Sequence, residues 1–119
     1  MYFTMILAII GSRTFDDYKL LCEFIGENYD INEIEEVVTG GADGADTLGE
    51  NWANENKKKL TVYPTDPSKV KKEEEYHRNH DMINACDKCV AFWDGKSAGT
   101  KRSIELCKER GKECKICRF

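Results

Sequence analysis

Hydrophobic residues follow two alternating patterns along this chain, and together they predict strands and helices in turn. Five short runs are continuously apolar or rich in β-branched residues, which is typical of strands covered on both faces of a sheet. We expect these strands at residues 5–10, 35–39, 60–63, 88–93 and 113–117. Between them, apolar residues recur at intervals of three and four, which is the helical period. The helices are expected at about 18–29, 45–56, 71–83 and 98–110.

The regular alternation of strand and helix predicts the fold class. Consecutive strands joined by helices pair in parallel through right-handed crossovers, and the helices then cover both faces of the sheet. We therefore expect an α/β fold, a three-layer α/β/α sandwich with a five-stranded parallel sheet in the order 3-2-1-4-5. No repeat, low-complexity segment or long linker divides the chain, so residues 1–119 are expected to form a single domain.

The stretch 37–52, VVTGGADGADTLGENW, joins a strand to a helix through a glycine-rich turn. Glycines permit backbone with positive φ and let a ligand approach the chain closely, and the N–H groups at a helix start favour an anion. The turn contains Gly40, Gly41 and Gly44. Asp43 is expected to cap the helix, and Asp46 follows three residues later. Because both carboxylates would repel a phosphate on the helix axis, they suit ribose hydroxyls, a bound cation or capping alone. A tight turn that binds nothing is the alternative.

Three turns rich in glycine and small polar residues are expected to meet at one edge of the sheet. In an open parallel sheet, ligands bind beyond the carboxyl ends of the strands, where the strand order reverses. The order 3-2-1-4-5 brings the turns after the first, second and fourth strands to this point. Those turns are residues 11–13, 40–44 and 94–100, whereas the turn after the third strand carries Pro64 and Pro67. This agreement of topology and composition predicts a ligand site.

The first and fourth turns offer groups suited to anions. The guanidinium of Arg13 matches phosphate or carboxylate in a bidentate contact, although an ion pair with nearby surface carboxylates is the alternative. Ser97, Gly99 and Thr100 open the fourth helix and could bind a second anionic group through N–H groups and hydroxyls. Ordinary helix capping by Ser97 would account for the same residues.

Length and charge narrow the class of protein. A chain of 119 residues supports one modest core. The net charge of −4 argues against a general nucleic-acid binder, which normally presents a basic surface. The apolar run 1–10 lacks a basic leading segment and a cleavage site, and it is too short to span a bilayer. We therefore expect a cytoplasmic protein that does not associate with membranes.

The cysteines form two C-x2-C pairs, Cys86/Cys89 and Cys114/Cys117, a spacing that nominally suggests zinc. However, residues 114–117 have the pattern of a strand, in which positions three apart point to opposite faces. Without a secretory signal, disulfides are not expected either. We therefore expect the cysteines to be small buried side chains and expect no metal. The full set is Cys22, Cys86, Cys89, Cys107, Cys114 and Cys117.

Other motifs are incomplete. The run GKS at 95–97 resembles the end of a P-loop, but the full pattern needs glycine where Val90 stands. The turn 40–44 lacks the G-x-G-x-x-G pattern of dinucleotide-binding proteins. His77 and His80, with Asp81, could be considered a metal cluster, but histidines three apart on a predicted helix without a further ligand are better explained by packing and solvent contact. No cofactor is expected.

Four motifs, taken together and in order, resemble one known family. They are GSRTF at 11–15, GGADGAD at 40–46, RN at 78–79 with Met82, and AFWDGKSAGT at 91–100. The chain resembles the YspA-like branch of the SLOG superfamily, which is named for the DNA-processing Smf proteins and the Lonely-guy cytokinin-activating enzymes. This resemblance covers nearly the whole chain. It implies a Rossmann-like parallel sheet and a pocket for nucleotides or nucleotide-derived ligands.

By position, the resemblance implies pocket residues in the three turns and in the third helix. They are Gly11, Ser12, Arg13, Gly40, Gly41, Gly44, Asp46, Arg78, Asn79, Asp94, Gly95, Ser97, Gly99 and Thr100. Lonely-guy enzymes carry P-G-G-x-G-T-x-x-E after the fourth strand, with a glutamate that serves N-glycosidic hydrolysis. Here Ser103 stands three after Thr100 and Glu105 lies too far along, which weighs against hydrolysis. Asp46 and Asp94 remain the candidate catalytic residues.

These observations lead to three hypotheses of function. The first is binding or sensing of a nucleotide or a nucleotide-derived phosphorylated ligand, held by N–H groups of the second and fourth turns and by Arg13 and Arg78. In this hypothesis Asp46 or Asp94 accepts hydrogen bonds from ribose hydroxyls. The second is an N-glycosidase that acts on a nucleoside 5′-monophosphate. The third, single-stranded nucleic-acid binding, is disfavoured by the acidic charge. The expected partner is a nucleotide-like small molecule, and a homodimer is left open because related domains often pair.

Overall fold

The computed structural model describes residues 4–63 and 71–119, and for residues 71–77 it describes the backbone alone. Strands and helices alternate as the hydrophobic pattern predicts. The strands are β1 (Met5–Gly11), β2 (Ile34–Thr39), β3 (Lys59–Val62), β4 (Lys88–Trp93) and β5 (Glu113–Arg118). The helices are α1 (Tyr18–Asn28), α2 (Ala45–Glu55), α3 (Lys71–Ala85), α4 (Ala98–Glu109) and a short 3₁₀ helix, Ile31–Glu33. The predicted loop at 65–70, with Pro67, lies outside the described residues, as does Pro64.

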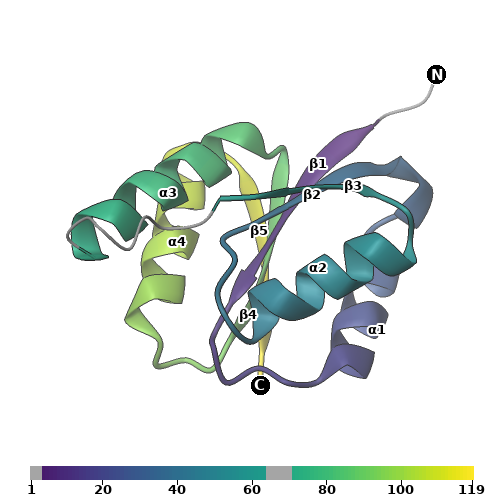
Figure 1. The fold of residues 1–119 in the computed structure, drawn as a ribbon, viewed down its shortest axis with the longest axis horizontal. Coiled ribbons are helices and arrows are strands. Elements are labelled where there is room, and N and C mark those ends of the chain that lie inside the picture. The colour runs from purple at the N-terminus through teal and green to yellow at the C-terminus, as the bar shows by residue number, and fades with distance from the viewer. Residues whose placement is uncertain (1–3, 64–70) are drawn as a thin grey trace.

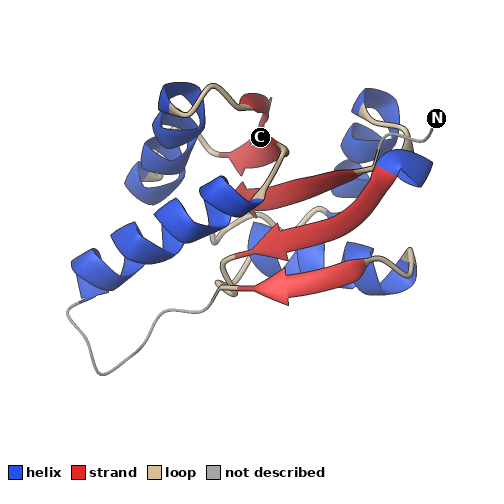
Figure 2. Cartoon of the chain, turned by 90° about the horizontal axis from the view of Figure 1, so that it is seen from above, coloured by secondary structure: helices blue, strands red, loops and turns tan. Residues whose placement is uncertain are grey.

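The five strands form one parallel sheet in the order β3-β2-β1-β4-β5, which confirms the predicted fold class. β1 lies at the centre and pairs with both β2 and β4, as its continuous apolar run requires. Figure 1 and Figure 2 show α1 and α2 on one face of the sheet and α3 and α4 on the other. The molecule is therefore a three-layer α/β/α sandwich, and the carboxyl ends of all five strands point to the same edge.

Alternate residues of the central strand fill two separate cores. On β1, Leu7 and Ile9 face α1 and α2, whereas Ala8 and Ile10 face α3 and α4. Trp52, which is 2% exposed, fills much of the first core. Burying one large apolar side chain contributes about 1.5–3 kcal/mol, so both faces of the sheet hold their helices firmly.

Capping explains where two helices begin and corrects one prediction. Asp17 caps α1, because its side chain accepts an N–H of the first turn. The predicted cap of α2, Asp43, is wrong: the capping residue is Gly44, which has a φ of 79°. A Cβ at Gly44 would lie 2.5 Å from the carbonyl oxygens of Ser12 and Arg13. Only glycine lets the turn after β2 pack this closely on the turn after β1.

The segment 30–34, between the first expected helix and the second expected strand, has structure of its own. Its centre is the 3₁₀ helix Ile31–Glu33, capped by Asp30, whose side chain accepts the N–H of Asn32 at 2.9 Å. β2 therefore begins at Ile34 rather than at residue 35. Asx capping of this kind orders a short connection that lacks any hydrophobic period.

Candidate functional site

A cavity of about 540 Å³ lies at the carboxyl edge of the sheet, where the turns after β1, β2 and β4 meet. The N-terminal part of α4 and one face of α3 complete its wall. This is the place that the strand order predicts, because the connections leave β1 in opposite directions there. The cavity is large enough for a nucleotide-sized molecule.

Ten of the fourteen predicted pocket residues line this cavity. They are Gly11, Ser12, Arg13, Asp46, Arg78, Asn79, Asp94, Ser97, Gly99 and Thr100. Five further wall residues were not among the predicted ones: Ile10, Thr14, Ala42, Met82 and Ser103. Thr14, Ala42 and Met82 belong to the quoted motifs or stand inside them, and Ser103 follows Gly99 by one helical turn, so sequence offered a signal for four of the five. Contact of these residues with a ligand remains a prediction.

The other four predicted residues, all glycines, shape the turns without lining the cavity. Gly44 packs on the turn after β1, as described above. A Cβ at Gly40 would lie 2.9 Å from Asp46 Oδ2 and 3.1 Å from Arg78 Cζ. Gly41 and Gly95 have φ of 74° and 83°, in the left-handed region that favours glycine. These glycines therefore allow side chains and backbone to approach one another behind the wall.

The turn after β1 is fixed by backbone contacts to β4. The N–H of Ser12 donates to the carbonyl of Phe92 at 2.8 Å, and the N–H of Asp94 donates to Ser12 Oγ at 3.2 Å. Ser12 is 2% exposed, so this pairing satisfies a buried hydroxyl. The result is a rigid link between the first and fourth turns, from which Arg13 extends along the rim of the cavity.

Asp46 brings a buried carboxyl group to the cavity wall. It is 5% exposed and stands in the first turn of α2, where its Oδ2 accepts the N–H of Ala42 at 3.2 Å. Burial raises the pKa of Asp46 from 3.8 to about 6, although hydrogen bonds from Ala42 and Gly40 and the charge of Arg78 oppose the shift. This carboxyl group therefore changes protonation state near neutral pH.

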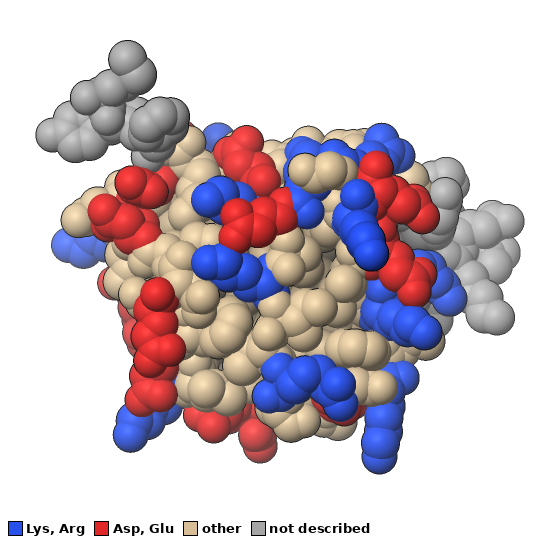
Figure 3. All heavy atoms as spheres, turned by 180° about the vertical axis from the view of Figure 1, so that it is seen from behind, with Lys and Arg blue, Asp and Glu red and all other residues tan. Residues whose placement is uncertain are grey.

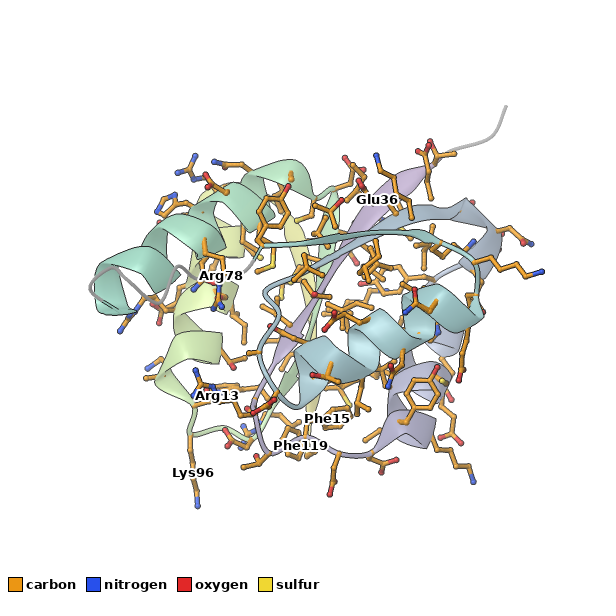
Figure 4. The ribbon with its side chains drawn as sticks, viewed as in Figure 1. Arg13, Phe15, Glu36, Arg78, Lys96 and Phe119 are labelled. Atoms are coloured by element: carbon orange, nitrogen blue, oxygen red, sulfur yellow. The ribbon has the colours of Figure 1, made fainter. Side chains whose placement is uncertain are left out.

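Arg78 and Asn79 project from α3 toward the second turn. Arg78 Nη1 donates to the carbonyl of Gly40 at 3.1 Å, and Arg78 Nε donates to Asn79 Oδ1 at 3.3 Å. These bonds hold the guanidinium in a fixed orientation, and its positive charge acts on Asp46. Figure 4 shows Arg78 on α3 and Arg13 beside the first turn of α4. Two cationic side chains therefore lie on different sides of one cavity.

The turn after β4 presents the N-terminus of α4 to the cavity. Asp94 Oδ1 accepts the N–H groups of Lys96 and Ser97 at 2.8 Å each, and these two bonds hold the pKa of Asp94 below its ordinary value. Ser97 is the capping residue, but its side chain makes no capping hydrogen bond, so the predicted capping alternative does not occur. Thr100 Oγ1 instead donates to Ser97 Oγ at 3.2 Å. The first N–H groups of α4 have no partner within the helix.

The last strand supports this turn from behind. A Cβ at Gly95 would overlap the guanidinium of Arg118, which also lies over the ring of Trp93 at 5.2 Å. Trp93 Nε1 donates to the carbonyl of Ser97 at 3.0 Å. Lys96, in the same turn, points away from the cavity in Figure 4 and does not line it.

The two C-x2-C pairs considered as zinc ligands do not come together as one group of four thiols. Cys114 and Cys117 face opposite sides of the sheet, which confirms the prediction made from their strand. Within the described part of the chain, the thiols that do lie close together belong to Cys89, Cys107 and Cys114. The side chain of His77 lies outside the described residues, and Nδ1 of His80 lies 2.8 Å from Arg110 Nη2.

Comparison with protein families decides the relationship. Residues 5–69, which are 65 of the 119, match the sequence model of the YspA, cpYpsA-related SLOG family. The chain belongs to this family. Membership of the SLOG family points to a function related to nucleotides. The matched stretch includes the turns after β1 and β2 but ends before α3, so the contributions of Arg78 and of residues 94–100 rest on the geometry of the cavity.

Other comparisons add nothing to the SLOG assignment. Searches of curated proteins and of solved structures found no match. Among the described residues, no helix has the length and apolar character needed to cross a bilayer.

Proposed function

We propose that this SLOG-family protein binds a phosphorylated nucleotide-like ligand in the cavity and acts as a binding or sensing module. The observation that supports this most strongly is the composition of the cavity wall. Arg13, Arg78, the N-terminus of α4 and the carboxyl group of Asp46 come from four different elements and face one space. Two cations and a helix N-terminus suit phosphate, and a carboxyl group suits ribose hydroxyls.

The N-terminus of α4 is the better place for the phosphate. At α2, the N–H of Ala45 already donates to the carbonyl of Ser12 at 3.3 Å, and the carboxyl group of Asp46 stands in the first turn. α4 has no acidic residue in its first turn. Gly99, whose Cβ position is clear of other atoms within 4 Å, leaves its backbone open to close approach. In this proposal the phosphate binds between the turn after β4 and Arg13. The sequence-based hypothesis had instead used N–H groups of both the second and the fourth turns.

The opposite part of the wall suits a nucleoside. Ile10 and Met82 supply apolar surface, which would pack against a base, and Asn79 offers an amide for hydrogen bonding. Asp46 lines the same cavity, so in this arrangement its carboxyl group would face the ribose. Because the pKa of Asp46 is about 6, its ability to accept two hydroxyl donors would decline as the pH falls below that value.

Thermal-shift titration with nucleoside mono-, di- and triphosphates would identify the ligand. The dissociation constant of that ligand would then be measured from a binding isotherm. Charge-assisted hydrogen bonds contribute about 1.5–3 kcal/mol each. Arg13→Gln and Arg78→Gln should therefore weaken binding about 10- to 100-fold. Lys96→Gln is the matched control, since it removes an equal charge from the same rim without touching the cavity. Equal losses in all three variants, or no nucleotide binding by the wild type, would contradict the proposal.

An N-glycosidase acting on a nucleoside 5′-monophosphate is the second candidate, and one observation favours it. The two carboxyl groups on the wall have pKa values shifted in opposite directions, raised for Asp46 and lowered for Asp94. Pairs separated in this way can divide acid and base roles. Incubating each nucleotide that binds and measuring free base tests this function. Base release that disappears in Asp46→Asn, while the ligand still binds, would replace the sensing role by catalysis.

A further inference from the structure

Three cysteines meet inside the molecule, away from the cavity. Cys89 on β4, Cys107 on α4 and Cys114 on β5 have sulfur atoms that all lie within 4.8 Å of one another. Cys89 and Cys107 are fully buried, and Cys114 is half-buried, so the cluster can be reached from the surface at one side. We call these three residues the thiol cluster.

The fold itself brings the thiol cluster together. Cys89 and Cys114 are partners in the parallel register of β4 and β5, so both side chains stand side by side on the face covered by α3 and α4. Cys107 lies on the inner face of α4 and packs down onto this pair. In Figure 1, α4 lies beside β5. The cluster thus depends on rigid secondary structure rather than on a loop.

Sulfur spacing in the cluster fits a shared metal ion. Thiolates bound to a metal lie about 2.3 Å from it, so three sulfurs around one ion in a plane are about 4 Å apart. The sulfur atoms of the cluster, all within 4.8 Å of one another, are compatible with this value. Cys86 lies on the same face of the sheet, but its thiol donates to the carbonyl of Ile83 at 3.2 Å and does not complete a group of four.

We propose that the thiol cluster binds one monovalent copper ion through three sulfur ligands. Soft thiolates select Cu(I) and Zn(II) among the common metals, and structural zinc almost always takes four protein ligands. Cu(I) accepts three thiolates in a planar site, which matches the number of sulfurs in the cluster. Each thiol releases its proton to solvent as its sulfur binds the ion. Copper binds as Cu(I) and remains Cu(I), so neither copper nor sulfur changes oxidation state.

Lys112 supplies a charge where such a complex needs one. Three thiolates and Cu(I) carry a net charge of −2, which is costly in a buried site without a nearby cation. The N–H of Lys112 donates to the carbonyl of Cys107 at 2.9 Å, and its ammonium group donates to the carbonyl of Cys86. The ammonium group also donates to the carbonyl of Asn84 at 3.1 Å, so it is held at the end of α3, from where its charge acts on the thiol of Cys107.

The thiol cluster is separate from the nucleotide-like site. None of the three cysteines lines the cavity, although Cys107 lies one helical turn beyond the wall residue Ser103. Cys89 is the second residue of β4 and lies about 13 Å along the strand from Trp93, at about 3.3 Å per residue. Copper binding and nucleotide binding can therefore be tested independently, and failure of one leaves the other unaffected.

Anaerobic titration of the reduced protein with Cu(I), in competition with a chromophoric Cu(I) chelator, tests the proposal. We expect one ion per chain, a near-ultraviolet thiolate-to-copper band and an X-ray absorption spectrum with three sulfur neighbours. Cys114→Ser should weaken binding by more than about 100-fold, since loss of even an outer contact costs 10- to 100-fold. Cys22→Ser is the matched control, because Cys22 is also half-buried but lies on α1.

Folding of the variants is checked by circular dichroism and thermal unfolding without metal, and Cys114→Val serves if the serine variant does not fold. Wild-type protein that yields all its Cu(I) to the chelator would overturn the proposal. The same holds if Cys114→Ser and Cys22→Ser retain copper equally. Preferential binding of Zn(II), lost in Cys86→Ser, would also overturn it in favour of a four-sulfur zinc site.

Discussion

At the scale of single residues, the burial of Asp46 makes the stability of the folded protein depend on pH. Its carboxyl group stands in the first turn of α2, is 5% exposed and accepts the N–H of Ala42 at 3.2 Å. The folded protein therefore holds the proton of Asp46 more tightly than the unfolded chain does. Stability from this group is fully present below its ordinary pKa of 3.8 and is lost as the pH rises through about 6.

Asp46→Asn should remove this dependence. We expect the free energy of unfolding of the wild type, relative to Asp46→Asn, to fall by about 2–3 kcal/mol between pH 4 and pH 7. Urea denaturation at several pH values measures the difference. Asp43→Asn, an exposed neighbour, is the control and should run parallel to the wild type. Parallel curves for Asp46→Asn would show that the carboxyl group is not buried in solution.

Gly44 is the residue on which contact between two turns depends. Its φ of 79° disfavours any side chain, and a Cβ would meet two carbonyl oxygens at 2.5 Å. Gly44→Ala should therefore lower the free energy of unfolding by about 3 kcal/mol or more. Gly26→Ala, within α1 and clear of other atoms, should instead raise it by about 0.5–1 kcal/mol. Denaturation of both variants would test this contrast, and equal changes would contradict it.

At the scale of elements, one acidic side chain of β2 adds to the backbone pairing that holds the edge strand β3. Glu36 Oε1 accepts the hydroxyl of Thr61 at 2.9 Å and lies 3.5 Å from the ammonium group of Lys59. Glu36 is labelled in Figure 4 at the end of the sheet away from the cavity. Because β3 has only four residues, these contacts form a large share of its side-chain interactions with the sheet.

Glu36→Leu should therefore loosen β3 in particular. We expect the free energy of unfolding to fall by about 1–2 kcal/mol, with faster amide hydrogen exchange in β3 than in β1. Glu35→Leu, on the exposed side of the same strand, is the matched control and should change little. Uniform exchange across the sheet in Glu36→Leu would argue that β3 does not open by itself.

The sequence was most informative about the helices and strands and their arrangement. The order of the strands followed from their alternation with helices, because right-handed crossovers leave few arrangements. The sequence predicted the start of α2 at residue 45 but not its cap, since the cap depends on how Gly44 packs against a turn distant in sequence. Ile10 was missed on the cavity wall because its apolar strand pattern predicts burial and does not show that the end of β1 borders a cavity. The thiol cluster likewise depends on the register of β4 with β5, which the sequence does not specify.

At the scale of the whole molecule, acidic and basic side chains are nearly equal in number. The chain carries 18 basic and 22 acidic side chains. On the face shown in Figure 3, the two kinds are interspersed. A polyanion would meet no continuous basic surface on that face, and nonspecific binding to nucleic acid depends on such a surface.

The protein should therefore bind single-stranded DNA poorly. We expect a dissociation constant weaker than about 100 μM near 150 mM salt, which is the weak limit of nonspecific binding. Fluorescence anisotropy of a labelled oligonucleotide, repeated at low salt, provides the measurement. Tighter binding with a steep salt dependence would revive the hypothesis of nucleic-acid recognition that the net charge disfavours.

The indole of Trp93 gives the protein a built-in optical reporter. The chain has two tryptophans, of which Trp52 is 2% exposed, whereas Trp93 is half-buried and bonded to the carbonyl that opens α4. A soluble quencher such as iodide should quench the half-buried Trp93 but not the buried Trp52. The fluorescence of the two tryptophans can therefore be separated. Ligand occupancy beside α4 can then be followed by fluorescence in unlabelled protein, and Trp93→Phe supplies the silent reference.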